Sequence, residues 1–329
     1  MFAKILNAAY QSYPLSKPNA VWLRLRFIKH TFKHYQLVAS FVENIEKLGY
    51  ANLFLHKIPV LGAVEWPYIH KDWTVAERFA VMQRHYEVIK KFPSFLDVAD
   101  GNPKVILDLS AYSPDTKIVL DKAQWFVREG EIVLNLFKED LRIMSIAFTL
   151  SEKDHHLVMF IGAIQGLHAN EHSLEKFKVL TKDFEGLRPR DLLMEVLRML
   201  AKSIGVSKVL AIADAYRHHR HPYFADYHAN TLKSSYDEIW LEQCGVAFGG
   251  DFYEIPIQKP RKDIAEVSSN KRAMYRRRYE MLDALQLRVD LLFGKKRVTA
   301  ESVDAVEALP QKNHVEATRK LEEQRLECI

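Results

Sequence analysis

The sequence predicts an α+β protein in which a helical N-terminal part precedes a mixed, mostly antiparallel sheet flanked by helices. Apolar residues recur at helical spacing up to about residue 96, and from about residue 104 they gather in short β-rich runs. Helical periodicity then returns before a further apolar run, as in a strand, crossover helix and parallel strand. We predict a helical region at 1–98, a mixed-sheet core domain at 99–297 and a peripheral helical tail at 298–329.

Composition limits the class of protein. With 329 residues, 48% of them hydrophobic, the chain can bury one large core or two modest ones. Two cysteines, Cys244 and Cys328, do not make a disulfide framework and favour a reducing compartment. Neither a clear secretion signal nor an apolar run long enough to span a bilayer is present in the sequence. We expect a cytoplasmic protein, with peripheral contact to the inner membrane left open.

Charge is unevenly distributed along the chain. The formal net charge is +5, yet residues 1–42 hold six Lys or Arg and no acid, and residues 261–297 hold eleven against five acids. This distribution predicts an anionic partner that meets particular surfaces. Nucleic acid is disfavoured as that partner, because no recognised binding motif is present and most of the chain is neutral to acidic.

Two amphipathic helices are predicted in the N-terminal part. The second, residues 74–92, begins with a capping box formed by Thr74 and Glu77. The first, residues 19–49, has an apolar stripe that favours packing into the core over lying on an anionic membrane. The stripe consists of Val21, Leu25, Ile28, Phe32, Tyr35, Val38, Val42 and Ile45. Apolar residues off this stripe, such as Trp22, keep the membrane alternative open.

The predicted sheet begins with an antiparallel meander of four strands. They cover "KVILDLS", "EIVLNLF", "RIMSIAFTL" and "HLVMFIGAIQG". Two helices at 173–184 and 188–205, a buried strand at 207–214, a short helix at 235–245 and a short strand at 251–256 follow, and a basic helix closes the domain. This order resembles the Gcn5-related N-acetyltransferase fold, an inference from topology alone. The phosphate signature of that fold, Gln/Arg-x-x-Gly-x-Gly/Ala, is absent, so we expect its acyl-donor site to be changed or lost.

Several stretches also resemble a known bacterial family. "GLRPRDLLMEVLRMLAKSIGV", "SYDEIWLEQCG" and "SSNKRAMYRRRYEML" are similar to the VirK/YbjX family (DUF535) of Gram-negative bacteria over roughly residues 20–295. The resemblance implies a link to virulence, envelope integrity and resistance to cationic peptides. It supplies no catalytic residues.

Cations gather at two predicted helix starts. Arg188 and Arg190 flank Pro189, and Lys271, Arg272 and Arg276 follow the N-cap candidates at 268–270. A helix N-terminus with added Arg suits a phosphate, whereas without an anion the cations oppose the helix dipole. We predict an anion site at these five cations, formed where the two segments meet. The alternative is a solvated, salt-bridged surface.

A histidine-rich loop follows the strand at 207–214. "DAYRHHRHPYFADYH" holds six His or Asp side chains, but their spacing matches no established metal pattern, so we expect no metal. His218 and His221 are candidate general bases, with Asp214 and Tyr223 close to a ligand, since α/β sheets bind ligands at the carboxyl ends of strands. Ordinary loop histidines are the alternative.

"GAIQG" marks the end of the fourth meander strand. Glycines Gly162 and Gly166 beside Gln165 indicate close approach of a ligand, for which Gln165 and Gly166 are our candidates, or a bulge where the sheet splays. In a Gcn5-like fold this strand accepts the amide arm of the donor.

Two hypotheses follow, and whether the protein is an enzyme stays open. The first is an acyltransferase-like protein of envelope biology whose phosphorylated ligand is a donor, such as coenzyme A or acyl-carrier phosphopantetheine, or a lipid acceptor. The second is a non-catalytic factor that binds an anionic lipid headgroup or an acidic protein.

Overall fold

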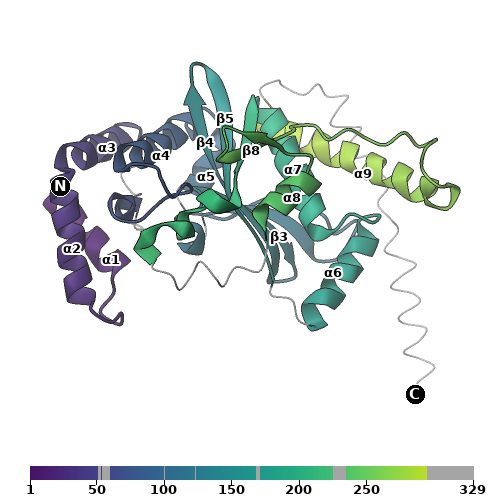
Figure 1. The fold of residues 1–329 in the computed structure, drawn as a ribbon. Helices are drawn as coiled ribbons and strands as arrows, with labels where there is room; N and C mark the ends of the chain where they lie inside the picture. The colour runs from purple at the N-terminus through teal and green to yellow at the C-terminus, as the bar shows by residue number, and fades with distance from the viewer. Residues whose placement is uncertain are drawn as a thin grey trace.

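The structure is a computed structural model that describes residues 1–50, 53, 60–99, 101–122, 124–167, 171–224 and 235–294. The predicted tail at 298–329 lies outside these residues. The described residues confirm an α+β fold with helices at the N-terminus and a mixed sheet flanked by helices (Figure 1). A single cluster of buried apolar side chains runs from Ile5 to Phe293, so the helical region and the sheet share a core.

Eight strands of the described chain form one sheet in the order β1-β2-β3-β4-β5-β6-β8-β7. Neighbours pair antiparallel except β5 and β6, which are parallel. The strands are β1 (Lys104–Asp108), β2 (Thr116–Asp121), β3 (Ile132–Lys138), β4 (Leu141–Lys153), β5 (His156–Gly166), β6 (Lys208–Ile212), β7 (Val246–Phe248) and β8 (Phe252–Ile255).

The sequence prediction missed strand β2. It lies between β1 and β3 and pairs with both, so the meander has one strand more than expected. Only Ile118, Val119 and Leu120 form its apolar run, and turn residues surround them. A run of three is too short to separate from a loop by periodicity.

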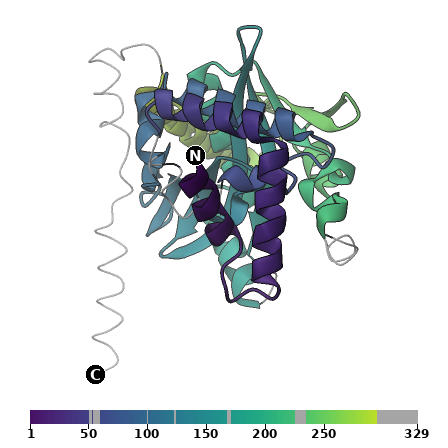
Figure 2. The ribbon, with the colours of Figure 1, turned by 90° about the vertical axis from the view of Figure 1, so that its left-hand side faces the viewer.

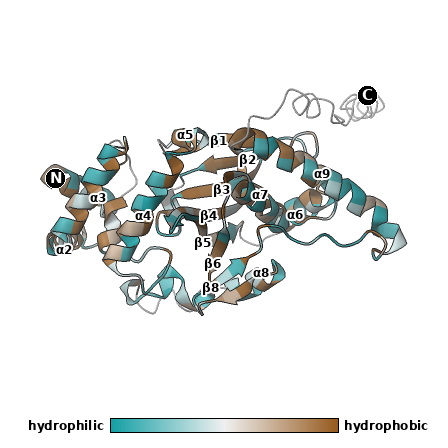
Figure 3. Cartoon of the chain, turned by 90° about the horizontal axis from the view of Figure 1, so that it is seen from above, coloured by the Kyte–Doolittle hydropathy of each residue, from teal (hydrophilic) through white to brown (hydrophobic). Residues whose placement is uncertain are grey.

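Helices cover both faces of the sheet. Figures 1 and 3 show α3 and α4 on one side of the strands and α6, α7 and α9 on the other. Helix α4 contacts β4, while α7 contacts β3, β4 and α9. The helices are α1 (Phe2–Ser12), α2 (Ala20–Lys33), α3 (Tyr35–Lys47), α4 (Val75–Ile89), α5 (Leu96–Ala99), α6 (Glu171–Asp183), α7 (Pro189–Ile204), α8 (Tyr236–Glu242) and α9 (Ser269–Phe293). None of the described helices is long and apolar enough to cross a membrane.

The apolar stripe predicted for residues 19–49 is only partly buried. Its second half packs into the core through Val38, Val42 and Ile45, as expected. Its first half faces outward, which corrects the prediction: Val21, Leu25, Phe32 and Tyr35 are all exposed. The reason is a break at His34 between α2 and α3, which allows α2 to pack through a different face, formed by Ala20, Phe27 and Thr31.

The sheet opens between β5 and β6. Their parallel pairing covers Val158–Ile161 against Lys208–Ala211, after which β5 continues to Gly166 paired with β4 but not with β6. The pairing of β5 with β4 shifts register at Gly162, which makes this glycine a bulge. A Cβ at Gly162 would lie 2.0 Å from the carbonyl oxygen of Glu129, so only glycine allows that backbone to approach. The bulge reading of "GAIQG" is therefore confirmed at Gly162.

Candidate functional site

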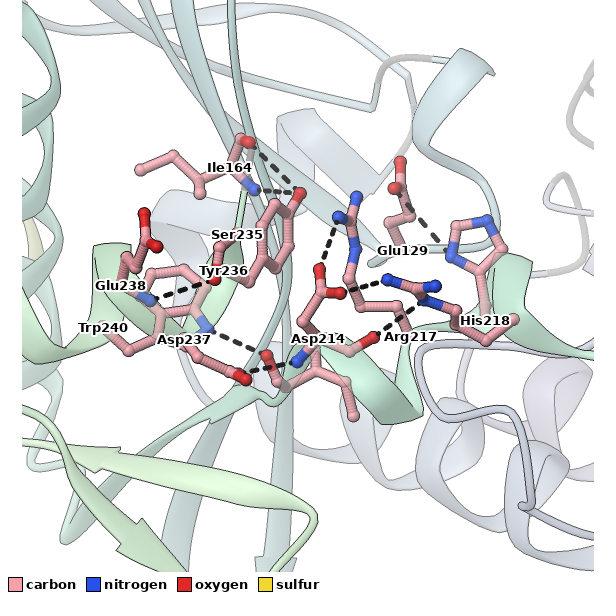
Figure 4. Close-up of polar contacts among 12 residues, drawn as sticks. Glu129, Ile164, Asp214, Arg217, His218, Ser235, Tyr236, Asp237, Glu238 and Trp240 are labelled. Atoms are coloured by element: carbon pink, nitrogen blue, oxygen red, sulfur yellow. Dashed lines mark hydrogen bonds and ion pairs between the residues drawn. The ribbon is translucent and has the colours of Figure 1, made fainter. Parts of the chain in front are cut away.

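Polar side chains from three segments meet beside the opening between β5 and β6. Glu129 precedes β3, Asp214, Arg217 and His218 follow β6, and Tyr236 begins α8 (Figure 4). Sheets with a parallel pair place ligands at this carboxyl end, where neighbouring strands part.

Glu129 and His218 form the titratable centre of this site. Glu129 is 5% exposed, and its Oε1 lies 3.9 Å from Nδ1 of His218, which is also buried. Burial raises the pKa of Glu129 to about 7, although Arg217 and Arg128 act in the opposite direction. A carboxyl group with this pKa is populated in both protonation states near neutral pH, as general acid–base chemistry requires.

Arg217 is held between Asp214 and the ring of Tyr236. Its Nη1 donates to Oδ1 of Asp214 at 3.2 Å, and its guanidinium carbon lies 3.5 Å from the centre of the Tyr236 ring. Burial acts to raise the pKa of Asp214, but hydrogen bonds from Arg220 and Arg217 outweigh it and leave that pKa below its usual value. Asp214 is therefore a charged residue that positions two arginines.

Tyr236 closes the free edge of β5. Its hydroxyl donates to the carbonyl of Ile164 at 3.1 Å and accepts from the amide of Ile164 at 3.0 Å. Burial is the main cause that raises the pKa of Tyr236, to about 12, so the phenol stays protonated. Trp240 Nε1, one turn along α8, donates to the carbonyl of Ile212 at 2.8 Å and ties this helix to the end of β6.

The other predicted ligand-proximal residues lie around this centre. Gln165 and Gly166 are exposed at the end of β5. Gly166 directs its backbone groups the same way as Ile164, because directions repeat every second residue of a strand. His221 Nδ1 accepts from the amide of Tyr223 at 2.9 Å, and burial lowers the pKa of His221. Tyr223 in turn contacts the hydroxyl of Tyr13 at 2.9 Å, on the side of the N-terminal helices.

A cationic cavity lies between α7, α9 and residues 257–262. Its volume is about 640 Å³, and "GLRPRD" and "AMYRRRYE" both contribute to its wall. Seven cations line it against three acids. The cations are Arg188, Arg198, Lys202, Lys259, Arg261, Lys262 and Arg278, and the acids are Asp191, Glu195 and Asp283.

Of the five predicted anion-binding cations, Arg188 lines this cavity. Arg190 and Arg188 both line a neighbouring, more apolar cavity of about 1000 Å³ between α6, α7 and α9, and both pair with Glu242. Lys271 and Arg276 are exposed on the first turns of α9. Arg272 donates to the carbonyls of 267 and 265 at 2.9 and 3.0 Å. The two basic segments thus meet, but through partly different residues.

Within the described part of the chain, no group of three or more His, Cys, Asp or Glu side chains could hold a metal. Asp226 and His228 of the histidine-rich loop lie outside the described residues.

Comparison with known proteins identifies the family. The family model "Protein of unknown function (DUF535)" matches residues 16–290. The chain belongs to the DUF535 family. It is 34% identical over 168 residues to the uncharacterized protein YbjX of Escherichia coli (strain K12), which covers 50% of each chain. It is also 33% identical over 172 residues to an uncharacterized protein of Haemophilus influenzae, covering 52% of this chain and 56% of that one.

The chain thus aligns with about half the length of these DUF535 relatives. No solved structure matches it. The family resemblance read from the sequence is confirmed.

Sequence reasoning missed three residues of this site, Glu129, Arg217 and Tyr236. Glu129 stands in "VREGE", a polar turn that matches no known catalytic motif. It reaches the site only because Gly162 has no side chain, so the backbone of Glu129 can lie close to β5. Tyr236 stands in "SYDEIW", one of the stretches that carried the family resemblance, and that was the available signal.

Proposed function

We propose that this DUF535 chain catalyses acyl transfer where β5 and β6 part. One observation carries the proposal: a buried glutamate with a pKa of about 7 lies against a histidine, beside a bulged strand at the opening of the sheet. The strand order, with one parallel pair, agrees with the Gcn5-related topology predicted from the sequence. The role of His218 as general base follows that prediction, and Glu129 is added to it.

The proposed reaction moves one acyl group from a thioester to an amine or hydroxyl. His218 accepts the proton of the acceptor as its nitrogen or oxygen attacks the thioester carbonyl carbon. The ionised form of Glu129 balances the charge of the imidazolium, as the carboxylate of a catalytic triad does, and keeps the same protonation state throughout. The carbon–sulfur bond then breaks, and the thiolate leaves and receives the proton from His218.

At the open edge of β5, the backbone groups of Gly166 are accessible to a donor, whereas those of Ile164 are occupied by Tyr236. We infer that a pantetheine arm pairs with Gly166 and that its phosphates bind in the cationic cavity. Following the family resemblance, we place the acceptor among envelope lipids or glycolipids and connect the reaction with envelope integrity and virulence.

Thiol release from acetyl- and palmitoyl-coenzyme A, measured with a total bacterial lipid extract as acceptor, tests this function. We expect Glu129→Gln and His218→Asn to lower the rate by about 100-fold or more, the usual contribution of a general base. His156→Asn, at an exposed histidine at the start of β5, is the control and should retain the rate. Loss of activity in His221→Asn but not in His218→Asn would refute the role of Glu129.

The cationic cavity favours a second function, a non-catalytic factor that binds an anionic lipid headgroup or an acidic protein. Lys202 and Lys262 line this cavity and form no ion pair with other described residues. Under this alternative, Lys202→Ala with Lys262→Ala weakens binding of short-chain phosphatidic acid in calorimetry, whereas His218→Asn does not change function. Binding of adenosine 3′,5′-bisphosphate by the same cavity favours a coenzyme A donor instead.

A further inference from the structure

Helix α2 presents an apolar face that the rest of the described chain leaves exposed. Val21, Trp22, Leu25 and Phe32 are 63%, 59%, 62% and 51% exposed. Their spacing places them along one side of a helix of 14 residues, about 21 Å long. Tyr35 extends this face, because its ring stacks on that of Phe32 at 6.2 Å. We call these five residues the α2 face.

The α2 face is not the side of α2 that packs against the rest of the protein. The opposite side of α2 is already packed, through Phe27 and Thr31, which are fully buried. Figure 2 shows the purple N-terminal helices at the outside of the molecule. Large exposed apolar patches on a folded protein usually mark an interaction surface.

The charged side chains of residues 1–42, the segment that carries this face, have a single sign. No acid occurs in residues 1–42. Two of the six cations there are neutralised, because Lys4 pairs with Glu46 and Arg26 pairs with Glu65. The remaining four make no ion pair with any described residue. They are Lys17, Arg24, Lys29 and Lys33.

Lys29 and Lys33 lie on α2 itself, at helical spacing from the apolar residues. Leu25 precedes Lys29 by one turn, and Lys29 precedes Lys33 by another. Long lysine side chains can keep their ammonium groups at the level of headgroups while the apolar residues enter the acyl region.

We propose that the α2 face docks on an anionic lipid bilayer, with α2 lying in the plane of the interface. The apolar face enters the headgroup boundary, and the four unpaired cations contact anionic lipid. A second copy of the chain is the less suitable occupant, since two faces of this kind would bring eight positive charges together without an acid between them. This inference is independent of the proposed acyl transfer.

Co-sedimentation of the full chain with vesicles tests the proposal. The vesicles are phosphatidylcholine alone, or phosphatidylcholine with one third phosphatidylglycerol. We expect binding to the anionic vesicles that weakens with salt, and a loss of about fivefold in partition for each of Lys29→Ala and Lys33→Ala. Val21→Glu with Leu25→Glu should abolish binding.

The matched control is Leu174→Glu with Val179→Glu, which places the same two charges at an exposed leucine and an exposed valine of another helix, α6. It should bind as the unchanged chain does, and far-ultraviolet circular dichroism should show all variants folded. Equal binding of the control and the Val21/Leu25 variant, or absence of binding by the folded unchanged chain, overturns the proposal. A concentration-dependent dimer that Val21→Glu dissociates would assign the face to a second copy.

Discussion

Replacing Glu129 by glutamine should stabilise the protein at alkaline pH while removing its proposed activity. The folded-state pKa of Glu129 is raised to about 7 by burial, above the value of about 4.3 for an unfolded glutamate. The native state therefore binds the proton more tightly than the unfolded state does. The stability due to this proton is fully present below about pH 4 and is lost as the pH rises through about 7.

The size of this effect follows from the two pKa values. A difference of about 2.7 units at about 1.4 kcal/mol per unit gives about 3–4 kcal/mol between pH 4 and pH 8. Glutamine has no proton to lose, so Glu129→Gln should unfold at a higher temperature than the unchanged chain at pH 8. The expected gain is about 5 °C, since chains of this size shift by about 2 °C or less per kcal/mol. At pH 4 the two melting temperatures should agree.

Differential scanning calorimetry at pH 4, 6 and 8 measures this difference, and Glu131→Gln provides a control of opposite sign. Glu131 is also buried, but it lies 3.4 Å from the ammonium of Lys122 and accepts from Tyr86 at 2.5 Å. Removing its charge leaves Lys122 buried without a carboxylate, which should cost about 3–5 kcal/mol near neutral pH. If Glu129→Gln lowers the melting temperature at pH 8, or shifts it equally at every pH, the assignment of Glu129 as a buried proton carrier is wrong.

Three further substitutions test the geometry of the site and its support, each by urea unfolding. Tyr236→Phe should lower the free energy of unfolding by about 1–3 kcal/mol, because it leaves both backbone groups of Ile164 without the hydroxyl; an unchanged midpoint would contradict those bonds. Gly162→Ala should cost more than about 2 kcal/mol, since the new methyl meets the backbone of Glu129, and full stability would show that the bulge can relax. Thr74→Ala should cost about 0.5–2 kcal/mol by removing the capping box of α4, whereas Thr74→Ser should retain most of that stability.

The sequence predicted the strands with long apolar runs well and missed a strand whose apolar run is short. Strands β3, β4 and β5 lie where β-rich stretches of seven or more residues predicted them, because such stretches leave few alternatives. Strand β2 carries three apolar residues and was missed. The α2 stripe was detected but assigned to the wrong side, since periodicity identifies an apolar face without indicating what covers it.

The candidate site was only half predictable for a similar reason. His218 was a candidate because it follows a buried strand, and strand ends can be read from the sequence. Glu129 could not be predicted, because it meets His218 across 89 positions of sequence and only through the bulge at Gly162. The carboxylate that holds Arg188 and Arg190 belongs to Glu242, which is also distant in sequence.

Helix α8 connects the proposed chemical centre with the cationic cavity. Its first residue, Tyr236, bonds the edge of β5, and its last, Glu242, pairs with Arg188 at the start of α7. The next residue, Gln243, donates to Oδ1 of Asp191 at 2.8 Å and accepts from Arg198 at 3.1 Å. Each end of α8 therefore contacts a group that is a candidate for donor binding: the backbone of Ile164 at its start and the guanidinium of Arg188 at its end.

Two modes of donor binding follow from this arrangement, and they differ in what happens to α8. A donor arm that pairs with Gly166 leaves the helix in place, because that edge is free of Tyr236. An arm that pairs with Ile164 must displace the hydroxyl of Tyr236, and its phosphates then compete with Glu242 for Arg188. Tyr236→Phe removes the hydroxyl that a donor at Ile164 must displace, so it should increase donor affinity in the second mode but leave it unchanged in the first. Calorimetric titration of coenzyme A into both forms therefore separates the two modes, and an affinity that falls in the variant would exclude both.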